Sequence, residues 1–457
     1  MSDSSNRQRK YFGTDGVRDI ANEGNMTPEF ALALGRAYTL FNIERGVKRP
    51  NIAVGRDTRF SGPMIQAALT AGINSAGGDV TDLGVIPTPG VSYAVANNNF
   101  DGGAVISASH NPSEYNGIKF LDGNGFKLTD SEELSIEDKI FGKNDSMRPT
   151  HSSLGTVALG LSISDDYLKS LQALMDDICR KDYPITTDGA NGAASHLLAP
   201  LFSSWKAKVN ITANKPDGIN INSGVGVTHM NHLCAETVKS GSLLGIAYDG
   251  DTDRVLMCDS KGRVLDGDIM LWVIGRWLAK HGKLGSGVVA TVMSNMILED
   301  LLAKDGIKVF RCGVGDRYVL DTMRKNDCRL GGEQSGHIIA LDHANTGDGL
   351  CSGALFLKAA EDLDEDIATL ADRFDRYPQV LTNVRIKSKE KLMSSVKLAD
   401  AVKDAEKKLE GKGRMLLRPS GTEPLLRIFV EARDVSLMEN IASSLEQTIN
   451  EIIAEEL

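Results

Sequence analysis

Strand patterns that alternate with helix patterns constrain the fold of this chain more than any other feature. The spacing of apolar residues predicts a strand over 51–54, a helix over 63–75 and a second strand over 80–83. Strands that alternate with helices of this length indicate a parallel sheet with right-handed crossovers. In open α/β sheets, ligands bind outside the carboxyl ends of the strands. The polar loops that follow the strands are therefore the first places to look for chemistry.

The alternation restarts along the chain, and the last segment differs from the rest. At ~100–200 residues per domain, a chain of 457 residues suggests three or four domains. A polar, charge-mixed stretch over 130–156 resembles a boundary, and further strand and helix patterns follow it to about residue 368. From about 375 the order is strand, helix, strand, loop, strand, helix. We therefore expect α/β domains with mainly parallel sheets, followed by a small α+β module.

Three local predictions are specific enough to test. Thr27 followed by Pro28 predicts the start of a helix. The apolar spacing over 392–409 predicts one continuous helix. Ser436 and Glu439 predict a capping box at the start of the last helix.

Composition and charge exclude several classes of protein. The formal net charge of -10 argues against a nucleic-acid-binding protein, which needs a basic face. The six cysteines form no C-x-x-C pair, so neither a zinc cluster nor a disulfide scaffold is indicated. The polar start at 1–10 lacks the apolar core of a secretory signal, and the most apolar run, 269–274, is too short to span a membrane. We expect a soluble cytoplasmic protein without nucleic-acid or membrane partners.

The first candidate site lies between residues 104 and 119. A buried strand pattern over 104–106 ends shortly before Ser109. His110 is adjacent to Ser109 and Lys119 follows ten positions later, so a hydroxyl nucleophile, a proton carrier and a phosphate-pairing cation come from one segment. The alternative is an ordinary turn whose side chains cap their own backbone. The segment alone leaves both interpretations open.

The second candidate is the acidic loop Asp249-Gly250-Asp251-Thr252-Asp253-Arg254, which follows an apolar strand pattern. Three carboxylates at alternating positions suit Mg²⁺ or Ca²⁺. An EF-hand is excluded because Arg254 and Ser260 stand where its Gly and Glu would be. A D-x-D-x-T aspartyl nucleophile is excluded because Asp253 stands in place of the Thr. The alternative is an acidic surface turn, although carboxylates this close repel one another without a cation or an arginine.

The third candidate is the glycine-rich loop over 331–337. Glu333 and Ser335 would suit hydrogen bonds to sugar hydroxyls, and His337 could carry a proton near neutral pH. A bent connection between strands that contains a satisfied histidine explains the same residues equally well. His229 and His232 form an H-x-x-H pair without an H-E-x-x-H context, so we interpret them as structural.

The fourth candidate is the loop over 418–424. Arg418 and Arg427 flank Ser420, Gly421 and Thr422, so guanidinium, hydroxyl and backbone N–H donors could together hold a phosphate. The alternative is a Pro/Gly hairpin turn with solvated arginines. The chain contains no G-x-x-x-x-G-K-[ST] sequence, so nucleotide-dependent phosphoryl transfer of that type is not indicated.

In this order and at these separations, the four loops resemble the α-D-phosphohexomutase family, from Phe12 to about Arg433. Within the family, the segments 11–18, 315–319 and 345–349 and the glycine-rich loop are most similar to members that act on glucosamine phosphates. One departure is Thr252, where relatives often carry Gly. Because this side chain lies between the expected ligand positions, we expect metal binding to survive.

The resemblance implies three α/β domains with mixed, mainly parallel sheets and a small C-terminal α+β domain around a central cleft. The implied domains are 1–150, which bears a phosphoserine, 151–254, which binds metal, 255–370, which binds sugar, and 371–457, which binds phosphate and closes over the cleft.

The resemblance also implies a role for each candidate residue. Ser109, rather than Ser107, would carry the phosphate. The ligands of Mg²⁺ would be a phosphate oxygen on Ser109 together with Asp249, Asp251 and Asp253. Arg254 would steady the same phosphate, while Lys119, His110 and Arg18 would serve proton transfer and charge stabilisation, with His337 as a second acid or base. Glu333 and Ser335 would bind sugar hydroxyls, and Arg418, Ser420, Gly421, Thr422 and Arg427 would hold the phosphate that does not react.

The implied activity is the interconversion of glucosamine 6-phosphate and glucosamine 1-phosphate through a phosphoserine and a 1,6-bisphosphate, which supplies UDP-N-acetylglucosamine synthesis. A metaphosphate-like transition state needs positive charge around its equatorial oxygens, which Mg²⁺, Arg254 and Lys119 could provide. Alternatives are a mutase for mannose or glucose phosphates, a sugar-phosphate-binding protein without activity, and a phosphatase. A homodimer is possible.

Overall fold

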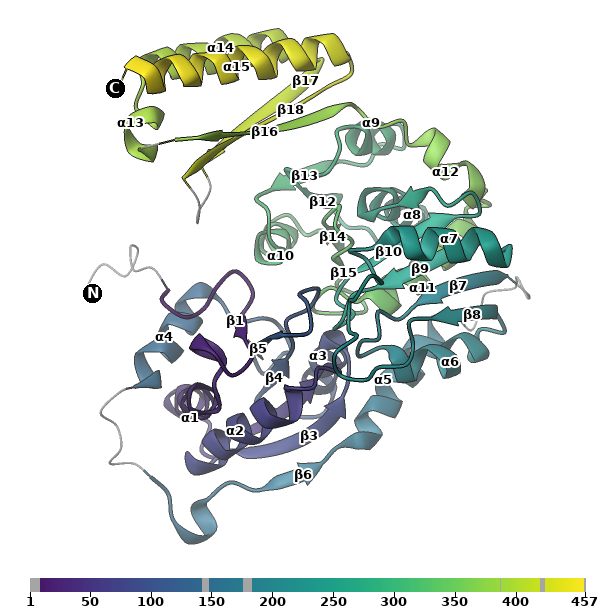
Figure 1. The fold of residues 1–457 in the computed structure, drawn as a ribbon. Helices are drawn as coiled ribbons and strands as arrows, with labels where there is room; N and C mark the ends of the chain where they lie inside the picture. The colour runs from purple at the N-terminus through teal and green to yellow at the C-terminus, as the bar shows by residue number, and fades with distance from the viewer. Residues whose placement is uncertain (1–8, 142–147, 176–182, 387, 420–423, 456–457) are drawn as a thin grey trace. The chain divides into compact units, whose positions relative to one another are not determined.

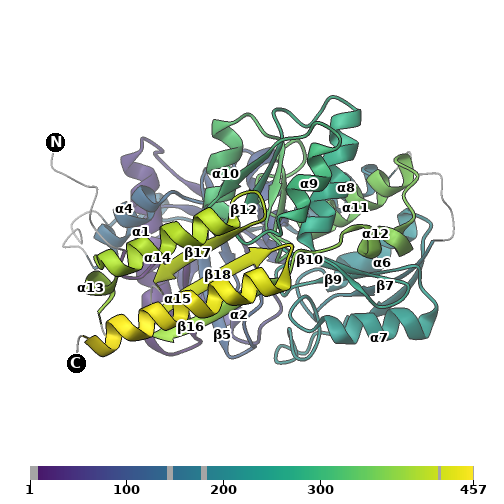
Figure 2. The ribbon, with the colours of Figure 1, turned by 90° about the horizontal axis from the view of Figure 1, so that it is seen from above.

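The computed structural model describes residues 9–141, 148–175, 183–386, 388–419 and 424–455. These residues form four β-sheets with helices packed on them, seen from two directions in Figures 1 and 2. The chain divides into two compact units, 1–294 with 302–373 and 295–301 with 374–457. The expected fold class is confirmed, since the larger unit holds α/β sheets with mainly parallel pairing and the smaller one an antiparallel sheet with helices.

The first sheet has the strand order β1-β5-β4-β2-β3-β6. Its strands are β1 Val17–Ile20, β2 Asn51–Arg56, β3 Asp79–Val85, β4 Gly102–Ile106, β5 Tyr115–Leu121 and β6 Val157–Leu159. Its helices are α1 Pro28–Glu44, α2 Gly62–Ser75, α3 Thr88–Asn97, α4 Asp130–Ile140 and α5 Leu161–Ala173, with short 3₁₀ turns at Gly24–Met26 and His151–Ser153. As the alternation of patterns predicted, β2 pairs in parallel with both β3 and β4.

Helices cover both faces of this sheet, so β4 is buried at every position and β2 at all but its two ends. Ile52 and Val54 of β2 belong to the core that α1 and α2 complete, whereas Ala53 belongs to the core under α3. Successive side chains of a strand point to opposite faces, so one strand contributes to two cores. The start of α1 is as predicted, since the Thr27 hydroxyl accepts a hydrogen bond from Phe30 N.

The second sheet has the order β11-β10-β9-β7-β8. Its strands are β7 Pro184–Asp188, β8 Lys208–Thr212, β9 Leu244–Tyr248, β10 Val255–Asp259 and β11 Val264–Leu265, and its helices are α6 Ser195–Ser204 and α7 Met230–Ser240. β10 turns back along β9 in antiparallel pairing. Residues 255–265 therefore extend this sheet, whereas the sequence analysis placed them in the third domain. In the same way, β6 pairs with β3 and extends the first sheet beyond residue 150.

The third sheet has the order β13-β12-β14-β15, with β15 antiparallel to β14. Its strands are β12 Val288–Thr291, β13 Val309–Cys312, β14 Leu330–Gly332 and β15 Ile338–Ala340. The helices of this part of the chain are α8 Gly267–Lys280, α9 Ile297–Ala303, α10 Asp316–Lys325, α11 Gly349–Asp362 and α12 Ile367–Arg373.

The smaller unit contains an antiparallel sheet in the order β16-β18-β17. Its elements are β16 Gln379–Arg385, α13 Lys389–Met393, α14 Val396–Leu409, β17 Gly413–Pro419, β18 Leu425–Ala432 and α15 Val435–Glu455. α14 and α15 lie side by side along one face of the sheet (Figures 1 and 2). Among the described residues, no helix is long and apolar enough to cross a membrane.

Two of the local predictions for this unit are wrong. The continuous helix expected over 392–409 is two helices, because Ser395 accepts a hydrogen bond from Leu398 N and starts α14 afresh. The last helix begins one residue before Ser436, and Asp434 Oδ1 accepts the hydrogen bond from Leu437 N at 3.1 Å. The carboxylate of Asp434 therefore occupies the capping position expected for Ser436.

Candidate active site

Ser109 lies on the loop that follows β4 and is almost fully buried. Its Oγ donates a hydrogen bond to Asp249 Oδ2 at 2.6 Å and lies 3.3 Å from His110 Nδ1. The backbone of Ser109 adopts φ 52°, which few non-glycine residues adopt. The serine hydroxyl is therefore held by a strained loop against the first carboxylate of the acidic loop.

A glycine allows the serine loop and the acidic loop to approach each other. A Cβ atom on Gly250 would lie 2.7 Å from the carbonyl oxygen of Ser109, closer than real Cβ contacts. Asn222 lies at the same junction, where its side-chain amide donates to Ser109 O at 2.9 Å. Any larger residue at position 250 would separate Ser109 from Asp249.

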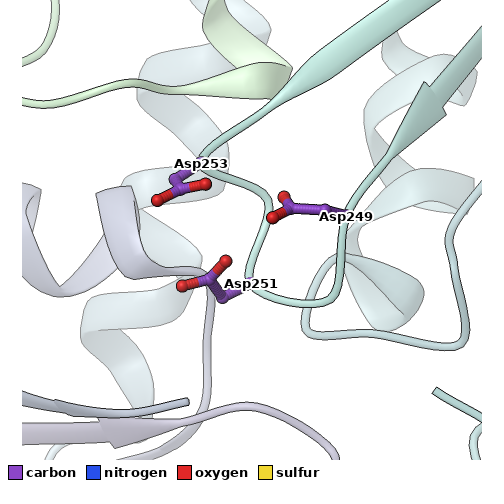
Figure 3. A group of neighbouring side chains, drawn as sticks. All are labelled: Asp249, Asp251 and Asp253. Atoms are coloured by element: carbon purple, nitrogen blue, oxygen red, sulfur yellow. The ribbon is translucent and has the colours of Figure 1, made fainter. Parts of the chain in front are cut away.

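Asp249, Asp251 and Asp253 converge on one point, as Figure 3 shows, with a carboxylate oxygen of each within 4.8 Å of the others. All three are buried. Among the described residues, Asp251 Oδ1 and Asp253 Oδ1 have no hydrogen-bond partner. Buried carboxylate oxygens without donors, grouped around one point, fit the all-oxygen coordination that Mg²⁺ and Ca²⁺ require. The residues present therefore fit a divalent cation.

The carboxylates of this cluster differ in how readily they ionise. Burial, followed by repulsion from Asp253 and Asp251, holds the pKa of Asp249 well above its usual range. Burial also opposes ionisation of Asp253, but the charge of Lys119 and the imidazole of His337 outweigh it, and its pKa lies well below the usual range. An added cation would lower the cost of ionising Asp249.

Lys119, on β5, lies between the acidic loop and a further carboxylate, that of Asp15. Its Nζ lies 2.8 Å from Asp251 Oδ2, 3.6 Å from Asp253 Oδ2 and 2.9 Å from Asp15 Oδ2. Burial would lower the pKa of Lys119, but the surrounding carboxylates, Asp15 foremost, raise it above its usual value. Lys119 is therefore a protonated ammonium beside the serine loop.

Asp15 is shared by further cations. Arg18 pairs with Asp15 Oδ2, and Lys127 Nζ lies 2.7 Å from Asp15 Oδ1 while also pairing with Asp316. The sequence analysis assigned a role to Arg18 but none to Asp15, Lys127 or Asp316. Their signal, charged residues beside the glycines of loops, is too common in sequences to single them out.

Arg18 and Arg254 each have one guanidinium nitrogen that makes no hydrogen bond within the described residues. The Nε atoms of both side chains are buried and lack a hydrogen-bond partner among the described residues. Their positive charges contribute, after burial, to lowering the pKa of His110 to about 4, so its imidazole is neutral near pH 7. Guanidinium Nε donors that make no hydrogen bond and lie near the serine loop are suited to an anion such as a phosphate.

His337 lies between the acidic loop and Asp316. Its Nδ1 is 3.7 Å from Asp253 Oδ2, and its Nε2 accepts a hydrogen bond from Gly347 N at 3.2 Å. The bond from Gly347 indicates the tautomer with the proton on Nδ1. Burial lowers the pKa of His337, but Asp253 raises it by more, so the ring binds a second proton more readily than an isolated imidazole. His337 is thus suited to proton transfer.

Of the remaining predicted residues, Glu333 lies near Arg254, whose pKa its charge raises, and Arg418 and Arg427 belong to the smaller unit. Glu333 follows β14 and its Oε1 accepts a hydrogen bond from Gly315 N at 3.0 Å, while Ser335 is exposed on the same loop. Arg418 and Arg427 are exposed and face each other across β17 and β18 of the smaller unit. Ser420, Gly421 and Thr422 lie outside the described residues. The structure thus brings together Ser109, His110, Lys119, Arg18, Arg254, His337 and the three aspartates.

Thr88 donates two hydrogen bonds to the acidic loop and was not predicted. It begins α3, and its hydroxyl donates to Asp251 Oδ2 at 2.6 Å while its backbone N–H donates to Asp251 O at 2.9 Å. A threonine at a helix start is a common capping residue, so the sequence gives no reason to assign it to a site.

Comparison with known families and relatives gives a consistent result. The family models described as phosphoglucomutase/phosphomannomutase alpha/beta/alpha domain I, alpha/beta/alpha domain III and C-terminal domain match residues 9–147, 266–377 and 381–447. A phosphoglucosamine mutase of Carboxydothermus hydrogenoformans is 44% identical over 447 residues, which are 97% of this chain and 100% of the relative. That of Bacillus subtilis is 41% identical over 442 residues, which are 96% and 98% of the two chains.

Solved structures share the fold. A phosphoglucomutase/phosphomannomutase family protein of Burkholderia thailandensis superposes with a TM-score of 0.82 at 22% identity, covering 97% of both chains. Aspergillus fumigatus N-acetylphosphoglucosamine mutase, solved in complex with GlcNAc-6P and magnesium, superposes with a TM-score of 0.65 at 15% identity, covering 98% of this chain and 96% of that one. At these identities, the structural similarity supports the fold alone.

Proposed function

We propose, since this chain belongs to the α-D-phosphohexomutase family, that it is an isomerase which interconverts glucosamine 6-phosphate and glucosamine 1-phosphate. The observation that carries the proposal is the buried Ser109 hydroxyl, which donates a hydrogen bond to Asp249 at the start of the acidic loop. The similarity to phosphoglucosamine mutases over 96–97% of the chain supports the choice of sugar. Glucosamine 1-phosphate would supply the synthesis of UDP-N-acetylglucosamine, which is a precursor of the cell wall.

The proposed reaction transfers one phosphoryl group out and one back. Phosphorylated Ser109 gives its phosphoryl group to the C1 hydroxyl oxygen of glucosamine 6-phosphate. The Oγ–P bond breaks as the O1–P bond forms, O1 loses a proton, and Ser109 Oγ gains one. The resulting 1,6-bisphosphate reorients, and Ser109 Oγ takes the phosphoryl group from O6, which gains a proton. The same donors must therefore stabilise both transfers.

The buried cations suit this transition state. The Nε donors of Arg18 and Arg254 and the ammonium of Lys119 lie in a water-poor environment, where they stabilise developing charge on phosphoryl oxygens more strongly than in water. Neutral His110 can accept a proton near Ser109, and His337, whose pKa Asp253 raises, can take up and release one. His110 and His337 are thus the proposed acid–base residues.

We infer that the resident metal is Mg²⁺, held by Asp249, Asp251, Asp253 and a phosphate oxygen on Ser109. When bound, it would neutralise negative charge on the phosphoryl oxygens. The orphaned oxygens of Asp251 and Asp253 support the site, and the choice of Mg²⁺ over Ca²⁺ rests on the preference of phosphoryl-transfer sites for a small, hydrated cation. Within the chain, Lys119 lies near Asp251 and Asp253, and His337 and Arg254 lie near Asp253.

The residues proposed to bind the sugar phosphate are Glu333, Ser335, Arg418, Ser420, Gly421, Thr422 and Arg427. Glu333 and Ser335 would accept or donate hydrogen bonds to sugar hydroxyls. The exposed guanidinium groups of Arg418 and Arg427 share one end of a strand pair, where a phosphate could engage both. The four domains 1–150, 151–254, 255–370 and 371–457 remain part of the proposal, and the pairing of β6 and β10 favours moving the first two boundaries to about 160 and 265.

Two further expectations stay proposals. The relatives are bacterial phosphoglucosamine mutases, and a cytoplasmic location is consistent with them. The edge strand β6 has exposed apolar side chains, with Val157 at 53% exposure and Leu159 at 76%, which supports a homodimer through this edge. Light scattering of the parent protein and of Leu159→Lys would test it, since a dimer formed elsewhere would survive the substitution.

The test of the proposed function compares purified parent protein with Ser109→Ala in the presence of Mg²⁺. Glucosamine 6-phosphate, mannose 6-phosphate and glucose 6-phosphate are supplied in parallel, and the 1-phosphates and free phosphate are measured. We expect glucosamine 1-phosphate to form fastest, without net release of phosphate, and Ser109→Ala to form none. Faster conversion of glucose or mannose phosphate would select another mutase of the family. Net phosphate release would indicate a phosphatase, and undiminished activity of Ser109→Ala would exclude the proposed mechanism.

A further inference from the structure

Arg59 is a fully buried arginine whose donors are directed at the loop that carries Ser109. Its side chain is 0% exposed. Its Nη2 donates to the carbonyl oxygens of Ser109 at 3.0 Å and Asn111 at 2.8 Å, and its Nη1 donates to that of Tyr115 at 2.9 Å and to that of Pro112. One guanidinium thus binds four carbonyl groups along the serine loop.

A series of hydrogen bonds also connects Arg59 to the backbone N–H of Ser109. The Nε of Arg59 donates to Asp57 Oδ2 at 2.9 Å, and the same oxygen accepts from the Ser107 hydroxyl at 2.6 Å. Ser107 Oγ in turn accepts from Ser109 N at 2.9 Å. The Arg59 guanidinium therefore holds the C=O of Ser109 directly and its N–H through the side chains of Asp57 and Ser107.

The serine loop needs such an anchor because its backbone conformation is unfavourable. Ser109 lies at φ 52°, and a residue held in the left-handed region keeps that conformation only where its surroundings enforce it. The planar guanidinium presents its donors in a fixed fork, which a lysine cannot reproduce. Burying the Arg59 charge is offset by Asp57 and by the four carbonyl dipoles.

The geometry points to Arg59 as the positioning residue of the proposed phosphoryl transfer, acting through Asp57 and Ser107 to set the direction of Ser109 Oγ. This inference rests on the proposed function. Arg59 does not touch the reacting atoms, and its role is to keep Oγ in line with the attacked phosphorus in both half-reactions. A displacement of about 1 Å at such an oxygen costs on the order of 10²-fold in rate.

The experiment measures a single phosphoryl transfer in folded protein. Parent, Arg59→Lys, Ser107→Ala and Arg56→Lys are converted to the phosphoserine form, mixed with glucosamine 6-phosphate, and followed by the loss of phosphate from the Ser109 peptide. Arg56 is the matched control, because it is the last residue of β2, three positions before Arg59, but its Nε donates to Gln66 Oε1 at 2.9 Å. Folded fraction and the dissociation constant of the sugar phosphate are measured on the same samples.

We expect Arg59→Lys to transfer phosphate about 10²-fold more slowly per folded molecule, with an unchanged dissociation constant. Ser107→Ala, which removes one small hydroxyl, should slow the transfer about tenfold by the same route. Arg56→Lys should match the parent. Should Arg59→Lys not fold, Ser107→Ala and Arg56→Lys decide the question alone.

Transfer within threefold of the parent in both Arg59→Lys and Ser107→Ala would overturn the inference while leaving the proposed function intact. A loss of activity that only mirrors a lost folded fraction would overturn it as well, since that is a purely structural role. A parent protein that never carries phosphate on Ser109 would instead overturn the proposed function, and this inference with it.

Discussion

Asp15 balances the positive charges of several side chains beside the serine loop. Its two oxygens pair with Lys119, Lys127 and Arg18, and its side chain is only 20% exposed. Burial opposes its ionisation, but these cations hold the pKa of Asp15 well below its usual range. The carboxylate therefore keeps several like charges together in a small volume.

Asp15→Asn should lower both stability and rate. Losing the shared carboxylate leaves partly buried cations without compensation, which we expect to reduce the free energy of unfolding by about 2 kcal/mol, less than for a fully buried pair because of the partial exposure. Lys119 would shift toward Asp251, and kcat should fall about tenfold or more. Urea denaturation and steady-state kinetics measure the two effects.

Asp372→Asn is the control, since Asp372 pairs with Arg263 at a site where its side chain is 58% exposed. Such surface pairs contribute about 0–1 kcal/mol. Equal effects of the two substitutions would contradict a special role for Asp15.

Thr252 stores strain in the acidic loop. It lies at φ 66°, is fully buried, and its hydroxyl has no hydrogen-bond partner among the described residues. A β-branched residue in this region of φ is a rare outlier that costs about 1–3 kcal/mol. Thr252→Gly should therefore raise the free energy of unfolding by about 1 kcal/mol, as measured by urea denaturation.

Asn22 provides a matched control for Thr252, because it has the same φ of 66°. Asn tolerates this conformation far better than Thr, so Asn22→Gly should change stability by less than about 0.5 kcal/mol. A loss of stability in Thr252→Gly would show that packing of the threonine side chain outweighs its backbone strain.

Asp348 should make stability depend on pH. Burial raises its pKa to about 6, although bonds from Cys351 N and the Tyr167 hydroxyl oppose the shift. An unfolded chain releases the same proton near pH ~4, so the folded state binds it more tightly. Its stabilising contribution is present below pH ~4 and is lost as the pH rises through about 6.

The stability of the parent relative to Asp348→Asn should therefore fall by about 2–3 kcal/mol between pH ~4 and pH ~7. Urea denaturation of both proteins at the two pH values measures this difference. A difference that stays constant, or that grows with pH, would contradict the assigned shift.

Some of these residues could be anticipated from the sequence and others could not. Ser109 and the aspartates stand out because a nucleophile and a metal-binding pattern each occupy a short segment after a strand. Arg59 was visible as an arginine after β2, but its role depends on carbonyl groups of residues 109–115, which backbone folding alone brings to it. Asp15, Lys127 and Asp316 are likewise distant in sequence and meet only in the folded chain.

At the level of helices, the start of α15 tests which capping residue acts. Asp434→Ala should cost about 1 kcal/mol, because Leu437 N loses its acceptor and a negative charge leaves the helix N-terminus. Ser436→Ala, at an exposed position inside the helix, should change stability by less than about 0.5 kcal/mol. Thermal unfolding monitored by circular dichroism compares the two variants. A larger loss of stability in Ser436→Ala would contradict capping by Asp434 and support the capping box predicted from the sequence.

The strands and helices of the larger unit were more predictable than their grouping. Apolar patterns located β2, β3 and β4 with small errors at their ends. The pattern over 255–259 is equally compatible with ending one sheet or beginning the next, because apolar periodicity does not record the pairing partner. Only the antiparallel register between β9 and β10 settles the sheet to which those residues belong.

Across the whole chain, the order of loops was more informative than any single loop. Each of the four candidate loops had a reasonable structural explanation, and their joint order suggested the family that the comparisons then supported. The described contacts unite the serine loop, the acidic loop and His337 in the larger unit. Sequence patterns could not supply these distances, nor show that buried atoms of Arg18, Arg254, Asp251 and Asp253 have no hydrogen-bond partner within the described part of the chain.

The most direct test of the account is the intact mass and peptide map of the purified protein before and after incubation with glucose 1,6-bisphosphate. The account predicts that one phosphate is gained on the peptide that carries Ser109, and that Ser109→Ala gains none. Ser107→Ala should still gain it, because Ser107 serves only to hold the loop. Absence of phosphate from Ser109 under turnover conditions would contradict the phosphoserine mechanism and favour a sugar-phosphate-binding protein without mutase activity.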